Sequence, residues 1–128
     1  MIYQFLRGRL ESVQALEGKV YPTTVCIDDI EGPFAVYTYK SRTAVCDLSG
    51  DVHHYNEEIL LDFLGASYDD LHELYRQAES ALAVSNFDTG NGEYIVSVTC
   101  SSPERDNVNL ENGLLRRTMM VTIRWCPV

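Results

Sequence analysis

Two adjacent histidines close to two aspartates are the residues of this chain best suited to metal or acid–base chemistry. His53 and His54 follow Asp47 and Asp51 in one short stretch. Imidazole and carboxylate groups bind zinc, and histidine also exchanges protons near neutral pH. Adjacent residues of a strand point to opposite faces, so the two histidines do not readily share one ion. Ordinary surface or partly buried histidines explain the pair better, and an enzyme with a concealed site here is the third hypothesis for function.

Other polar segments are better explained as turns than as ligand-binding loops. The acidic run from Asp28 to Gly32 fits a solvated loop. The run from Asp88 to Gly92 lacks the alternating ligands that a calcium loop requires. The sequence contains no P-loop, G-x-G-x-x-G, H-E-x-x-H or G-x-S-x-G motif. We therefore expect a protein that binds rather than catalyses, without catalytic residues, cofactor or metal.

The cysteines are widely spaced and form no C-x-x-C pair. Zinc sites usually take ligands in closer pairs, so a structural metal is not indicated. The first residues, from Met1 to Arg7, do not have the order of charge and apolar residues that a signal peptide has. We therefore expect reduced thiols in a cytoplasm. The four cysteines are Cys26, Cys46, Cys100 and Cys126.

The clearest structural signal is a strand followed by a helix between Tyr55 and Val84. Apolar and polar residues alternate from Tyr55 to Leu64, which is typical of a strand with one buried face. Apolar residues then recur at helical spacing, and Ser67 with Asp70 approximates a capping box. The apolar residues of this helix are Leu71, Leu74, Tyr75, Ala78 and Leu82.

The remaining elements follow from the same two periodicities. An apolar stripe predicts a helix from Ile2 to Leu16, which Glu17-Gly18 ends. The last strand should place Arg116 and Arg124 on its polar face, where they can pair with Glu58 or Asp62. The other predicted segments are an extended segment from Val20, a strand from Pro33 to Lys40, a long connection or flexible hairpin tip from Ser41 to Val52, a turn-rich loop from Ser85 to Glu93, a strand in which Tyr94, Val96, Val98 and Cys100 share one face, a polar segment from Ser102 to Gly113, and a strand from Leu115 to Trp125.

This order of helix, strands, helix and strands predicts the fold class. We expect a single α+β domain over residues 1–128, with an antiparallel or mixed sheet of about four strands. Both helices should pack on one face of that sheet.

Composition bounds the class of protein and its partners. The chain has 128 residues, 45% of them hydrophobic, which suits one globular domain. Its apolar runs are too short to predict a membrane span. The formal charge of −9 argues against tight nucleic-acid binding, because phosphate contacts need clustered cations. The same charge suits a basic protein partner, or a surface past which DNA slides without sticking.

Several short motifs occur together in an order that resembles one family. They are Val20-Tyr21-Pro22, the run from Pro33 to Tyr37, the run from Leu61 to Leu71, and the run from Glu111 to Arg116. In this order and spacing the chain resembles the tail-completion, or tail-to-head joining, proteins of long-tailed bacteriophages and prophages. The resemblance covers nearly the whole chain, from Met1 to Trp125, and matches less clearly at residues 28–31 and 43–51.

The resemblance implies a structural protein of the virion, made in the bacterial cytoplasm. Such subunits form a homo-oligomeric ring, usually a hexamer, at the head-proximal end of the tail tube. Their partners are the tail-tube protein and the head-closure or connector protein, and DNA passes through the ring without specific binding. Ring closure needs a heterologous interface, for which sheet edges and long loops are the natural elements. The interface residues expected on this basis are Arg42, Asp47 and Asp51 in the first loop and Glu104, Arg105 and Asp106 in the second. A small acidic cytoplasmic adaptor or inhibitor of a basic protein is the alternative.

Overall fold

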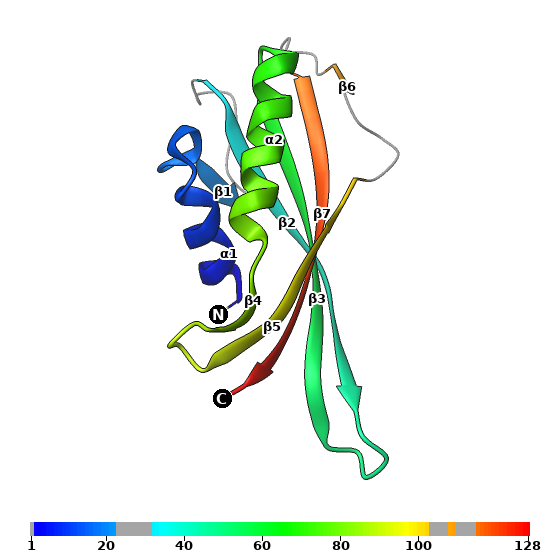
Figure 1. Ribbon diagram of the computed structural model, residues 1–128. Helices are drawn as coiled ribbons and strands as arrows, with labels where there is room; N and C mark the ends of the chain where they lie inside the picture. Colours follow the sequence, from blue (N-terminus) through cyan, green and yellow to red (C-terminus); the bar gives the residue numbers. More distant parts are fainter. Residues whose placement is uncertain (1, 23–31, 103–107, 110–114) are drawn as a thin grey trace.

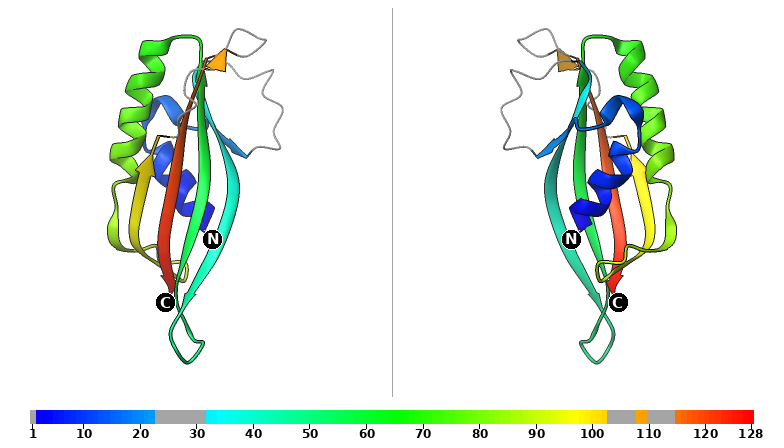
Figure 2. Two further views of the ribbon diagram at one scale, coloured as in Figure 1. Left: turned by 90° about the vertical axis from the view of Figure 1, so that its right-hand side faces the viewer. Right: turned by 90° about the vertical axis from the view of Figure 1, so that its left-hand side faces the viewer.

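The computed structural model has the α+β architecture that the sequence predicts, with helices on one face of a mixed sheet. It describes residues 2–22, 32–102, 108–109 and 115–128. The described strands form one seven-stranded sheet in the order β1-β2-β3-β7-β5-β4, and β6 pairs with β7 outside this path. Figures 1 and 2 show α1 and α2 together on one side of that sheet. The elements are α1 (Ile2–Glu11), the 3-10 turn η1 (Gln14–Leu16), β1 (Val20–Pro22), β2 (Phe34–Cys46), β3 (Val52–Gly65), α2 (Tyr68–Leu82), β4 (Ser85–Asp88), β5 (Glu93–Ser101), β6 (Val108–Asn109) and β7 (Leu115–Pro127).

The prediction of about four strands was wrong in number. The four long strands β2, β3, β7 and β5 form the antiparallel centre of the sheet. Three short strands join them: β1 is parallel to β2, β4 is antiparallel to β5, and β6 is antiparallel to β7. The extended segment predicted from Val20 corresponds to β1, whereas β4 and β6 are too short to show a periodicity in the sequence.

The main core lies between the helices and one face of the sheet. Buried residues of α1 and α2 share a single cluster with Ile59, Leu61 and Phe63 of β3 and with alternating residues of β7. The alternation predicted for β3 is confirmed, and so is the apolar face of α2, whose five predicted residues are all buried. Ser67 caps α2 as predicted, because its hydroxyl oxygen accepts a hydrogen bond from the amide of Asp70 at 3.4 Å. The buried residues of β7 are Thr118, Met119, Val121, Ile123 and Trp125.

The first helix is shorter than predicted. It ends at Glu11, and the apolar residues Val13 and Leu16 reach the core through the 3-10 turn instead. Gly18 has a φ of +69°, a conformation that glycine adopts without strain, so the chain does turn at Glu17-Gly18, but this turn follows the 3-10 segment and does not end the α-helix. Arg9 donates a hydrogen bond to the carbonyl oxygen of Ala81 at 2.9 Å, which joins α1 to the end of α2.

The largest correction concerns the segment from Ser41 to Val52, expected to be a long connection or a flexible tip. Residues 41–46 continue β2 and pair with β3 as far as its first residue, Val52, and only residues 47–51 form the turn. Because β7 pairs with β3 only from Tyr55 onward, the end of the hairpin extends beyond the other strands (Figure 1). We name residues 44–54 the arm. The segment expected to be a turn-rich loop, residues 85–93, likewise contains a strand, β4.

A bulge in β5 changes the predicted sharing of faces. The register of β5 against β7 shifts between Ile95 and Ser97. As a result, Ile95, Val98 and Cys100 pack toward the main core, whereas the sequence grouped Val98 and Cys100 with Tyr94. A bulge inserts one extra residue and reverses the alternation beyond it.

The second face of the sheet is polar along its centre. Thr118 donates a hydrogen bond to Asp62 at 2.7 Å, and the guanidinium of Arg116 lies 4.0 Å from the same carboxylate. The pairing predicted for Arg116 is therefore confirmed. Arg124 lies opposite Asn56 and donates to its side-chain oxygen at 3.2 Å, rather than pairing with Glu58 or Asp62.

Candidate functional site

The base of the arm carries a buried ion pair. Arg42 of β2 lies directly opposite Glu57 of β3, and both face the helices. The Nε of Arg42 donates to Oε1 of Glu57 at 2.5 Å, and the Glu57 side chain is only 1% exposed. A buried carboxylate needs such a partner, because its desolvation is otherwise costly. The hydrogen bond that Arg42 donates to Glu57 raises the pKa of the Arg42 guanidinium, so this cation persists at all accessible pH values.

Two aromatic rings complete this cluster. The Cζ of Arg42 lies 5.4 Å from the ring centre of Tyr55 and 5.5 Å from that of Trp125, within the range of cation–π attraction. The two rings stack with their centres 4.9 Å apart. Arg42, Tyr55, Glu57 and Trp125, here named the base cluster, therefore join β2, β3 and β7 where the arm leaves the sheet. The Arg42 side chain is still 49% exposed, so part of its guanidinium faces solvent.

A cavity of about 310 Å³ opens beside the base cluster. Ile2 and Tyr3 of α1 and Tyr39 of β2 form apolar walls, and Tyr39 is half exposed. Glu57 and Glu93 also line the cavity, and both are buried. Thr89 donates a hydrogen bond to Glu93 at 3.1 Å. The cavity thus combines two tyrosine rings and one aliphatic side chain with two buried carboxylates and the half-exposed guanidinium of Arg42.

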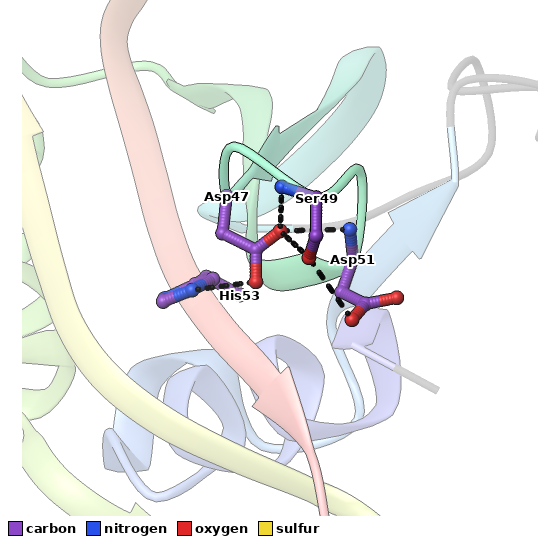
Figure 3. A network of polar contacts seen from close by, with 4 residues as sticks. All are labelled: Asp47, Ser49, Asp51 and His53. Carbon is purple, nitrogen blue, oxygen red and sulfur yellow. Dashed lines mark hydrogen bonds and ion pairs between the residues drawn. The ribbon is translucent and has the colours of Figure 1, made fainter.

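The tip of the arm is a compact turn held by Asp47 (Figure 3). Its Oδ1 accepts hydrogen bonds from the amides of Ser49 and Asp51 at 2.9 and 3.0 Å, and from the Ser49 hydroxyl at 2.6 Å. Its Oδ2 lies 3.4 Å from Nε2 of His53. These hydrogen bonds, led by that from the Ser49 side chain, lower the pKa of Asp47. The turn is therefore ordered, although all its residues are exposed.

The turn presents an apolar side chain to solvent. Leu48 is fully exposed at the apex, and Val52 is 42% exposed at the start of β3. Nothing in the hydrogen bonding of the turn requires a leucine at this position. Leu48 therefore combines a backbone held by the hydrogen bonds of the turn with an apolar side chain that is open to solvent.

The structure brings together only some of the residues that the sequence grouped as chemically promising. His53 reaches Asp47, whereas His54 lies on the other face of the arm opposite Val45. Within the described ranges, no group of three or more His, Cys, Asp or Glu side chains is arranged to hold a metal ion. The described cysteines Cys46, Cys100 and Cys126 are free thiols, and Cys26 lies outside the described residues.

The predicted interface residues fall into two groups. Arg42 is a strand residue of the base cluster, not a loop residue as expected, whereas Asp47 and Asp51 do lie in the turn. Glu104, Arg105 and Asp106 lie outside the described residues, as does the acidic run 28–31. The interface role of all six residues stays a prediction.

Sequence reasoning missed Glu57, Trp125 and Leu48 as parts of this site. Glu57 could have been recognised, because it lies on the same face of β3 as Ile59 and Leu61, and a charged residue on a buried face needs a partner. Leu48 carried a weaker one, as the lone apolar residue of a turn rich in aspartate, serine and glycine.

Comparisons with known proteins add no relative to this picture. No protein-family model matches the sequence, and no curated protein matches it significantly. Within the described residues, neither α-helix is long and apolar enough to cross a membrane.

Proposed function

We propose that this protein is a structural subunit of a phage or prophage tail, which forms a ring at the head-proximal end of the tail tube and joins the tail to the head connector. The observation that carries the proposal is the arm. Its two strands pair only with each other among the described residues, and a two-stranded ribbon is only marginally stable without further contacts. Such an element gains its full stability when another chain covers it.

The edges of the sheet support an assembly role. Beyond Tyr37, the outer edge of β2 has no partner strand within the described part of the chain, because β1 pairs only with residues 35–37. An unpaired edge presents amide and carbonyl groups that another chain can bind. The opposite edge is the short strand β4, whose four residues are all exposed. A chain with two different free edges can join copies head to tail, which is the geometry of a closed ring.

The phage assignment rests on the order of motifs from Val20 to Arg116, and the charge of −9 fits a ring through which DNA passes without being held. On this proposal the protein is not an enzyme and needs no cofactor. It resides in the virion, and it contacts the tail-tube protein and the head-closure protein.

The test is native mass by light scattering over a range of protein concentrations, alone and with the tail-tube protein encoded nearby. A ring of defined mass, alone or on the tube, is the expected result. A monomer that ignores the tube under all conditions would refute the proposal.

The acidic adaptor is the second candidate, and α2 favours it. Asp69, Asp70 and Glu73 are exposed in the first turns of this helix and form an acidic surface for a basic partner. An adaptor would remain monomeric and would bind a basic protein with an affinity that falls steeply with salt.

A further inference from the structure

The arm tip and the cavity beside the base cluster complement each other in shape and chemistry. We propose that Leu48 of one copy inserts into the cavity lined by Ile2, Tyr3 and Tyr39 of the next copy. This inference rests on the proposed ring function and names the interface that closes the ring.

The sizes of the two features agree. An apolar cavity of roughly 150 Å³ already accepts a benzene molecule, and this cavity, at about 310 Å³, has room for the isobutyl group of a leucine. Insertion would bury the Leu48 side chain, which is fully exposed in the single chain, and it would also cover Tyr39, which is 51% exposed.

The charges of the two surfaces are also complementary. The turn carries Asp47 and Asp51, both exposed. The β2 segment beside the cavity carries Lys40 and Arg42, which are exposed cations in a chain of net charge −9. Glu57 and Glu93 lie buried in the cavity, and Arg42 offsets the charge of Glu57. Because Arg42 is already paired, the attraction for an incoming acidic turn comes from Lys40, two residues before it on β2.

The leucine cannot reach the cavity of its own chain. Arg42 and Leu48 are six residues apart on an extended hairpin, which separates them by about 20 Å along the strand, and the arm is directed away from the helices (Figure 1). The occupant must come from a second copy. Leu48 at the arm tip, here named the knob, and the cavity are different surfaces. Each copy can therefore insert its knob into one neighbour and accept the knob of another, so the contact is heterologous and can close into a ring.

Paired serine variants test the contact in solution. Leu48→Ser removes the knob and Tyr39→Ser removes a cavity wall, whereas Tyr68→Ser is a matched control at a tyrosine that is 49% exposed on α2. We expect each of the first two changes to weaken self-association by about 10- to 100-fold, the factor that burial of one large apolar side chain provides. The control should associate as the natural protein does. Mixing the two defective variants should restore one interface per pair and yield dimers, but no larger ring.

Disulfide trapping tests proximity directly and registers even weakly populated contacts. With Cys46→Ser in both partners, a copy carrying Leu48→Cys is oxidised with a copy carrying Tyr39→Cys, using oxidised glutathione. A covalent dimer between the two is expected, and the pair of Leu48→Cys with Tyr68→Cys is the control. Equal cross-linking in the two pairs would overturn the inference.

The two proposals fail in different ways. A ring that forms equally well with Leu48→Ser would overturn the knob-and-cavity contact and leave the ring subunit standing. A monomer under all conditions that also gives no Tyr39-specific cross-link would overturn both.

Discussion

Replacing Arg42 by methionine tests whether the buried ion pair holds the base of the arm. The change keeps an unbranched, flexible side chain but shortens it, and it removes the only cation within 4.0 Å of Glu57 in the described structure. Exposed ion pairs typically contribute less than about 1 kcal/mol, whereas breaking a buried pair costs about 3–5 kcal/mol. Glu57 is 1% exposed and Arg42 49%, so this pair lies between the two classes. We expect Arg42→Met to lower the free energy of unfolding by about 2 kcal/mol.

The assay is urea unfolding followed by the fluorescence of Trp125, the single tryptophan of the chain, whose ring contacts Arg42. With a slope of about 2 kcal/mol per molar urea, the transition midpoint should fall by about 1 M. Low protein concentration keeps self-association out of the measurement.

The double variant Arg42→Met, Glu57→Met is the decisive control. It removes both charges and leaves two apolar side chains of suitable size between Tyr55 and Ile123, so its stability should return to within about 1 kcal/mol of the natural protein. Glu57→Met alone should cost little, because the half-exposed Arg42 can turn to water. A double variant as unstable as Arg42→Met alone would refute the reasoning, since the loss would then come from packing rather than from an unpaired buried carboxylate.

Three further outcomes follow from the described contacts. Burial, with a smaller contribution from Glu79, raises the pKa of Cys100 to about 11, so at pH 8 roughly one thiol in 10³ is ionised. Labelling with iodoacetamide, followed by peptide mass mapping, should therefore modify the exposed Cys46 and spare Cys100. Equal labelling of the two would contradict the burial of Cys100. The folded-state pKa of Asp47 is lowered, so the hydrogen bonds from the Ser49 and Asp51 amides should persist as the pH falls through the ordinary aspartate range, and they should be lost only as it falls through that lowered pKa. NMR titration of the Asp47 carboxyl group and of the two amides measures this. An ordinary aspartate titration would argue against the ordered turn. Ser67→Ala removes the side chain that caps α2. Because the capping hydrogen bond is long, at 3.4 Å, we expect the free energy of unfolding, measured by thermal unfolding, to fall by only about 0.5–1 kcal/mol. Ser80→Ala, on the exposed face of the same helix, should leave the stability unchanged.

The sequence predicted the elements that bury one continuous face. In β3, α2 and β7 the apolar residues repeat with one period throughout, so their buried positions were read correctly. Residues 41–46 were missed as a strand because their burial does not alternate: Arg42, Thr43 and Ala44 are all exposed in sequence. Such a segment is held by its pairing with β3, which a sequence pattern does not contain.

The candidate site was predictable only in part, for a related reason. Arg42, Asp47 and Asp51 were singled out by charge and position, but the pairing of Arg42 with Glu57 depends on a register shift in β2 between Tyr39 and Ser41. Without that single extra residue, Arg42 would point to the opposite face of the sheet, away from Glu57 and from the helices. One bulge thus decides whether the buried carboxylate has a partner.

The bulge, the ion pair and the arm are therefore one physical unit. A ribbon of two strands twists and bends readily, because neither of its faces packs on a core. For the proposed contact, the arm needs a fixed direction to place Leu48 into the cavity of a second copy. The base cluster joins β2 to β3 and β7 through a charge pair and two stacked rings, which can fix that direction. An apolar pair at the same place would pack as well but would not favour one register of β2 on β3. A buried carboxylate favours the register that brings Arg42 opposite it. Loss of the pair should consequently weaken self-association more than its effect on stability alone explains, because the turn at the tip would persist while the direction of the arm would no longer be fixed.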